Sequence, residues 1–194
     1  MSGDTQVKTA HVFGMGFTQT LGGGSGQIAL WRKARVYSSP DHVILPPAPW
    51  RTDPREIAVF LARLAPLRIY GYFYSWGAGW FGRRLIRALD ELGLGFETIV
   101  LCDPVARSNI SPDWLPLNIT SLFSFHRIVI PPNVRQVHRL YQRVDKPCGH
   151  RLRIADPSRT VVLSDRELNV CHARMEDHDD YHALVLSTIQ EATR

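Results

Sequence analysis

The chain has 194 residues, of which 44% are hydrophobic and 21% charged, and a net charge of +5 at pH 7. This composition can bury one sizeable core, so we expect a single domain over residues 9–194 after a flexible N-terminus at residues 1–8. The arginines are dispersed along the chain, which disfavours nucleic acid as a partner. No run is long and apolar enough to predict a membrane span.

Two further features bear on the compartment. The first residues are polar and lack the apolar run of a secretory signal. The three cysteines, Cys102, Cys148 and Cys171, have no paired spacing, and their odd number disfavours a disulfide framework. We therefore predict a cytoplasmic protein and leave its oligomeric state open.

Strand-like and helix-like segments alternate from residue 10 onward. Short apolar runs predict strands at 10–13, 42–45, 67–72, 96–101, 127–130, 134–143 and 161–163. Apolar residues at helical spacing predict helices at 28–36, 54–64, 81–92 and 181–189. This alternation is typical of an α/β fold, in which a mostly parallel central sheet carries helices on both faces.

The helix at 54–64 has the clearest local signal. Asp53 is a favourable N-cap and Pro54 suits the first helical position. The apolar residues that follow recur at the spacing of one helix face, which we expect to be buried: Ile57, Phe60, Leu61 and Leu64.

A serine stands at a strand-to-helix turn in the middle of the chain. The segment 68–79, RIYGYFYSWGAG, runs from a predicted strand through small residues into a predicted helix, with Ser75 at the turn. A serine in that position has its hydroxyl at the end of the sheet, beside helix N–H groups that favour developing negative charge. Ser75 is therefore a candidate nucleophile. The competing interpretation is that its hydroxyl only caps the helix.

Four short motifs resemble, in order, those of the α/β-hydrolase superfamily. YSWGAG, from Tyr74, resembles the nucleophile elbow of lipase-like and esterase-like members, and VFGMGF, from Val12, resembles their oxyanion-loop segment. LCDPV, from Leu101, resembles a strand end that carries the triad acid, and CHARMED, from Cys171, resembles the histidine loop. Serine, then aspartate, then histidine is the order that this fold uses. The chain resembles a short form of the family, without a separate cap domain.

The resemblance implies a serine hydrolase that cleaves a carboxylic ester or a thioester. Ser75 would be the nucleophile, His172 its general base, and Asp103 the acid that orients the imidazole. The backbone N–H groups of Trp76 and of Met15 or Phe17 would form the oxyanion hole. The expected partner is a small-molecule ester or acyl substrate, and the mechanism requires neither a metal nor an organic cofactor.

Two positions leave alternatives open within this fold. Asp145, after the predicted strand at 134–143, competes with Asp103 as the triad acid. Phe73 stands where the elbow usually has glycine, and a bulky side chain there should crowd the turn. That crowding favours a second hypothesis, a catalytically inactive binding or assembly module.

The region from His172 to His182 supports a third hypothesis, a metal-binding protein. It contains nitrogen and oxygen donors but no recognised ligand spacing. His178 and His182 are four residues apart, and we expect them on the exposed face of the last helix rather than in a site.

A long apolar connection follows the proposed acid. Residues 104–126 combine turn-forming residues with Trp114, Leu115 and Phe123. These side chains are candidates for a substrate pocket, and the segment is a candidate lid, since loops at the carboxyl ends of parallel strands surround the ligand crevice. Alternatively, the same side chains fill the edge of the core.

Overall fold

Six parallel strands form the central sheet of the computed structural model, which describes residues 7–16, 25–105 and 127–194. In spatial order the strands are β2 (His42–Ile44), β1 (Thr9–Gly14), β3 (Arg68–Tyr74), β4 (Phe96–Cys102), β6 (Val134–Tyr141) and β8 (Val161–Glu167). The predicted parallel sheet is therefore confirmed. The last strand continues well past its predicted end at residue 163.

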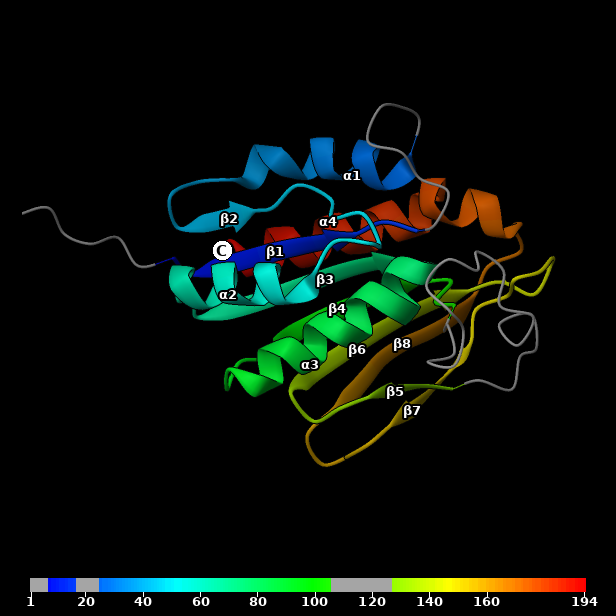
Figure 1. Ribbon diagram of the computed structural model, residues 1–194. Coiled ribbons are helices and arrows are strands. Elements are labelled where there is room, and N and C mark those ends of the chain that lie inside the picture. The colour runs from blue at the N-terminus through cyan, green and yellow to red at the C-terminus, as the bar shows by residue number, and fades with distance from the viewer. Residues whose placement is uncertain (1–6, 17–24, 106–126) are drawn as a thin grey trace, which may run out of the picture.

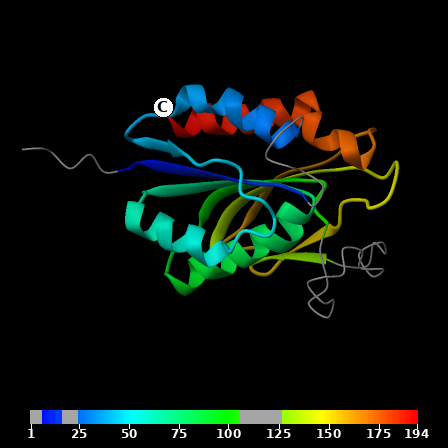
Figure 2. The same cartoon turned by 45° about the horizontal axis from the view of Figure 1, so that its top comes forward.

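Four helices cover the two faces of this sheet. α1 (Gly26–Ala34) and α4 (Asp179–Ala192) lie on one face, and α2 (Pro54–Leu64) and α3 (Arg83–Glu91) lie on the other (Figures 1 and 2). Shorter helical turns are η1 (Arg35–Tyr37), η2 (Gly77–Gly82) and η4 (His172–Asp177). Helices on both faces were predicted, and the structure confirms them. Within the described ranges, no helix has the length and apolar character needed to cross a bilayer.

A separate pair of parallel strands lies beside the main sheet. β5 (Arg127–Ile130) pairs with β7 (Arg151–Ile154), which has no counterpart among the predicted strands. The sequence RLRI of β7 alternates charged and apolar residues over only four positions, too few to distinguish a strand from a loop. Ile128 and Ile130 of β5 join the core on the α2 and α3 side of the sheet.

Helix α2 begins where its capping signal predicts but is rotated from the predicted buried face. Asp53 accepts a hydrogen bond from the backbone N–H of Arg55 at 3.0 Å, as an N-cap does. The buried positions are Pro54, Ala58 and Leu61, whereas Phe60 is 43% exposed. Leu61 is therefore buried as predicted, whereas Phe60 lies at the margin of the buried face.

The strands alternate their side chains between two cores. In β3, Phe73 faces α2 and α3, while Tyr72 and Tyr74 face α1 and α4. Both cores are closed, since all three aromatic side chains are at most 4% exposed. The end of β3 is therefore fixed from both sides of the sheet.

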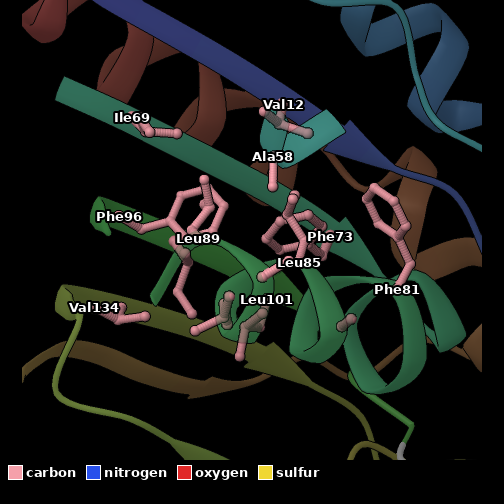
Figure 3. Packing of buried hydrophobic residues seen from close by; sticks show 14 of the residues in the cluster. Val12, Ala58, Ile69, Phe73, Phe81, Leu85, Leu89, Phe96, Leu101 and Val134 are labelled. Carbon is pink, nitrogen blue, oxygen red and sulfur yellow. The ribbon is translucent and has the colours of Figure 1, made fainter. Parts of the chain in front are cut away.

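Phe73 does not crowd the turn that follows it, contrary to expectation. Its ring packs edge-on against Phe81 and Phe96, with ring centroids 6.1 Å and 5.8 Å away (Figure 3). The ring occupies space left by glycines, because a Cβ on Gly71 or Gly14 would lie 2.5 Å or 2.6 Å from its carbons. The glycines that make room near the turn of Ser75 therefore lie against the Phe73 ring rather than at position 73 itself.

The strand order places a topological switch point next to β3. From β1 the chain moves to β2 on one side and then to β3 on the other, so the connections leaving β1 and β3 diverge. In open α/β sheets, the crevice at the carboxyl ends of two such strands is the usual ligand site. Ser75 follows β3 at this edge.

We predict that Phe73→Ala destabilises the protein by about 3–5 kcal/mol, because it leaves a cavity that the neighbouring glycines cannot fill. Chemical denaturation measures the change in unfolding free energy. The matched control is Phe60→Ala, at a partly exposed position of helix α2. Its expected loss of unfolding free energy is below about 1 kcal/mol. Equal losses in the two variants would contradict the assigned role of Phe73.

Candidate active site

Ser75 occupies a tight turn between β3 and η2. Its backbone is left-handed, with φ of 51°, a conformation that non-glycine residues rarely adopt. Its N–H continues the sheet by donating to the Cys102 carbonyl at 3.0 Å, and its own carbonyl accepts from Ala78 and Gly79 at the start of the helix. These bonds hold the strained residue in place and direct its side chain away from the strand.

Two glycines allow the loop after β1 to touch this turn. A Cβ on Gly77 would lie 2.6 Å from the carbonyl oxygens of Gly14 and Met15. A Cβ on Gly16 would lie 3.2 Å from Cβ of Ser75. The backbone that follows β1 therefore runs directly beside the serine.

The three residues predicted for the triad lie in one hydrogen-bonded chain. Ser75 Oγ is 2.9 Å from Nε2 of His172, and Nδ1 of the same ring is 2.5 Å from Oδ2 of Asp103. Ser75 is 4% exposed and Asp103 is fully buried. The two ring nitrogens thus face a hydroxyl on one side and a buried carboxylate on the other.

The two candidate acids contact different atoms of His172. Asp103 follows β4 with φ of 42°, and its carboxylate meets the imidazole ring. Asp145 instead accepts the backbone N–H of His172 through Oδ1 at 2.7 Å. The geometry therefore places Asp103 at the ring and Asp145 at the main chain.

Tyr74, directly before the serine, holds the histidine from a second direction. Its ring stacks on the His172 ring with centroids 5.3 Å apart and planes 25° apart. Its hydroxyl donates to the His172 carbonyl at 2.8 Å. Burial raises the pKa of Tyr74 strongly, so the phenol stays protonated and remains a donor.

One of the predicted oxyanion donors is wrong. The N–H of Met15 donates to the Ala48 carbonyl at 2.9 Å, because β1 continues its pairing with the segment after β2. That N–H is therefore engaged in the sheet. Trp76, the other predicted donor, directly follows Ser75 at the start of the helical segment, and Phe17 lies outside the described residues.

An aromatic cluster adjoins the serine. Trp50 and Trp76 meet edge to face with centroids 5.5 Å apart, and Val105 and Trp80 complete the cluster. The N–H of Val105 also donates to the Ser75 carbonyl at 3.1 Å. The predicted pocket residues Trp114, Leu115 and Phe123, and nearly all of the proposed lid at 104–126, lie outside the described residues.

His182 is buried, which corrects the expectation that it lies on an exposed helix face. Its Nε2 is 2.8 Å from the Glu176 carbonyl, and its Nδ1 is 3.2 Å from Nζ of Lys33. The carbonyl requires Nε2 to carry the proton, so Nδ1 accepts from the lysine. His178 caps α4 by accepting the N–H of Asp180. In the described part of the chain, no three His, Cys, Asp or Glu side chains gather as metal ligands do.

Glu176 ties the histidine segment to helix α1. Its carboxylate accepts from the hydroxyl of Ser25 at 3.2 Å and from the N–H of Gln27 at 3.1 Å, at the beginning of that helix. Burial raises the pKa of Glu176 to about 7, although both hydrogen bonds act in the opposite direction. The segment carrying His172 is therefore anchored by a group that titrates near neutral pH.

Sequence reasoning missed several residues that hold the site. Tyr74 is only one letter of the YSWGAG motif, and Glu176 is one of the oxygen donors between His172 and His182. Gln142, which contacts Asp103, belongs to no motif in the sequence. A buried glutamine at a strand end has no spacing or neighbour pattern that distinguishes it in a single sequence.

Comparison with known proteins assigns neither a family nor a function to the chain. No protein-family model matches the chain, and no curated protein matches it. Among solved structures, it is similar to RedJ, described with a PEG molecule bound in its active site. The identity is 14%, the TM-score is 0.48, and the match covers 95% of this chain and 88% of RedJ. A similarity of this level carries no inference about activity.

We predict that Glu176→Gln gains stability relative to the unmodified protein as pH rises from 4.5 to about 7. The folded pKa is raised to about 7 from 4.5, so the native state binds this proton more tightly and loses stability as it leaves. Glutamine mimics the protonated acid and avoids that loss, by less than about 1.4 kcal/mol per pH unit. Unfolding free energies at pH 5 and pH 8 measure the effect, and a difference independent of pH would refute it.

Proposed function

We propose that the protein is a serine hydrolase that cleaves a carboxylic ester or a thioester. The observation that carries the proposal is the chain of contacts from Ser75 through His172 to Asp103, at 2.9 Å and 2.5 Å. The strained backbone of Ser75 is a second support, because residues held in sparsely populated conformations concentrate at functional sites.

In the first half of the reaction, Ser75 Oγ attacks the carbonyl carbon while Nε2 of His172 takes the hydroxyl proton. The buried carboxylate of Asp103 accepts from Nδ1, which fixes the tautomer and stabilises the positive charge on the ring. The imidazolium then gives its proton to the departing alcohol or thiol. In the second half, water repeats the sequence on the acyl-enzyme and releases the acid.

The tetrahedral intermediate carries its negative charge on the former carbonyl oxygen. We assign one donor to the N–H of Trp76, which begins the helical segment after the nucleophile. We assign the second donor to the segment that follows β1, where Gly16 lies beside Ser75. Phe17, the predicted donor, lies outside the described residues. Met15 is excluded because its N–H bonds to Ala48.

The neighbourhood of the serine favours an apolar acyl or aromatic group. Trp50, Trp76 and Trp80 lie together on the segments after β2 and β3. Trp50 and Trp76 are buried, so an apolar substrate group would contact chiefly the partly exposed Trp80, at about 25 cal/mol per Å² of apolar surface buried. The substrate class remains a small molecule with an apolar acyl group, and the steps above need no cofactor.

The alternative of a catalytically inactive module loses its main argument. That argument was crowding of the elbow by Phe73, but the ring is fully buried against Phe81 and Phe96 and leaves the turn of Ser75 in place. The metal-binding alternative has no ligand cluster among the described residues to support it.

Labelling with a fluorophosphonate, followed by mass spectrometry, tests the proposal. The reagent should modify Ser75, and Ser75→Ala should abolish labelling. Ser187→Ala, which removes an exposed serine on α4, should label like the unmodified protein. Modification of another residue, or none in a folded protein, would refute the assignment.

Replacing Asp103 or Asp145 by asparagine should change the labelling rate to different extents. Asp103→Asn should lower the labelling rate by a factor on the order of 10³–10⁴, because the amide favours the wrong imidazole tautomer. Asp145→Asn should cost less than about tenfold, because the amide oxygen still accepts the His172 N–H. The reverse order of effects would move the role of triad acid to Asp145.

A further inference from the structure

Gln142, the first residue after β6, is a fully buried amide between two loops of the site. Its backbone N–H donates to Oδ1 of Asp103 at 3.2 Å, and its Nε2 donates to Oδ2 of Asp103 at 3.1 Å. Both oxygens of one carboxylate are thus bonded to a single residue.

The same side chain fixes the loop that follows. Nε2 also lies 3.1 Å from the carbonyl of Asp145 and 2.9 Å from that of Pro147, and Oε1 accepts the N–H of Asp145 at 3.0 Å. With three acceptors around the nitrogen and one donor at the oxygen, the orientation of the amide is defined by its partners. A glutamine side chain supplies both a donor and an acceptor at this reach.

These contacts connect the two carboxylates that hydrogen-bond to His172. Asp103 holds the ring at Nδ1, and Asp145 holds the backbone N–H. Gln142 contacts both residues, so a change in its position moves the ring acceptor and the main-chain acceptor together.

Burial makes Asp103 depend on its donors. A buried carboxylate is costly unless hydrogen bonds replace the water that it has lost. Three bonds to the Asp103 carboxylate are found among the described residues, and Gln142 provides two of them.

We propose that Gln142 is a positioning residue of the hydrolase: it orients the carboxylate of Asp103 and ties it to the loop that holds the His172 backbone. The expected effect on reaction rate rests on the proposed function, because the alignment of His172 affects a rate only if Ser75 reacts. The alignment itself is measurable without a substrate.

The direct readout is the His172 Nδ1 proton. A histidine proton shared with a carboxylate gives a far-downfield proton NMR resonance, which reports this hydrogen bond whether or not Ser75 reacts. Its loss in His172→Gln assigns the signal. Failure of the proposed function would appear separately, as absence of labelling in the unmodified protein.

Gln142→Met keeps the length of the side chain and removes its donors and acceptor. We expect the downfield resonance to disappear or move, and the maximal labelling rate to fall on the order of 10- to 100-fold with the reagent's half-saturation concentration unchanged, since small misplacements of catalytic groups cost that much. Gln142→Leu covers the case in which the methionine variant does not fold. Its side chain also lacks donors and acceptors, so the same changes are expected.

The matched control is Gln136→Met, a substitution within β6 itself. Gln136 accepts from Thr98 at 3.0 Å, at the end of β6 distant from Asp103. This variant should keep the resonance and the labelling rate. A folded Gln142→Met or Gln142→Leu protein with an unmoved resonance and an unchanged rate would overturn the proposal, as would equal losses in Gln136→Met.

Discussion

The ladder of parallel strands continues to the last residue of β3 and β4, and the site depends on that continuity. Ser75 donates to Cys102 and Asp103 donates to Leu140, each one residue beyond the strand that carries it. Residues far apart in the sequence therefore reach the same edge of the sheet in fixed register. Because Ser75 and Asp103 then turn with positive φ, their side chains leave the sheet at its edge rather than from its faces.

The α/β-hydrolase motif that this turn resembles implies a different source of space for the turn. A glycine two residues before the serine would leave room at the strand end, whereas here Phe73 occupies that position. Its ring points into the α2 and α3 core, where Gly14, Gly71 and Gly82 have no side chains to oppose it. Close approach is still required on the other side of the turn, where Gly77 meets the carbonyls that follow β1. Glycines therefore make room in two places: for the Phe73 ring in the core, and for the backbone contact beside Ser75.

Local patterns in the sequence predicted the elements that such patterns govern. The alternation of apolar runs and helical stripes was sufficient for the sheet and its two helical layers, and the turn around Ser75 followed from a strand, small residues and a helix. Properties set by distant partners were not predictable. Met15 loses its N–H to Ala48 through an extension of the sheet, and His182 is buried by contacts with Glu176 and Lys33. Ala48 and Lys33 are far in sequence from the residues that they contact. Glu176 is six residues from His182, but a backbone carbonyl has no sequence signature.

The choice between the two acids shows why a sequence leaves that question open. Asp103 and Asp145 each follow a strand and each lie at the same edge, so both reach His172, and position along the chain does not rank them. Burial does distinguish them, because a fully buried carboxylate needs dedicated donors, and Gln142 supplies two to Asp103. The same glutamine accepts from the backbone of Asp145 and fixes its loop, which leaves the Asp145 side chain facing the main chain of His172. Gln142 thereby helps to place Asp103 at the imidazole ring of His172 and Asp145 at its backbone N–H.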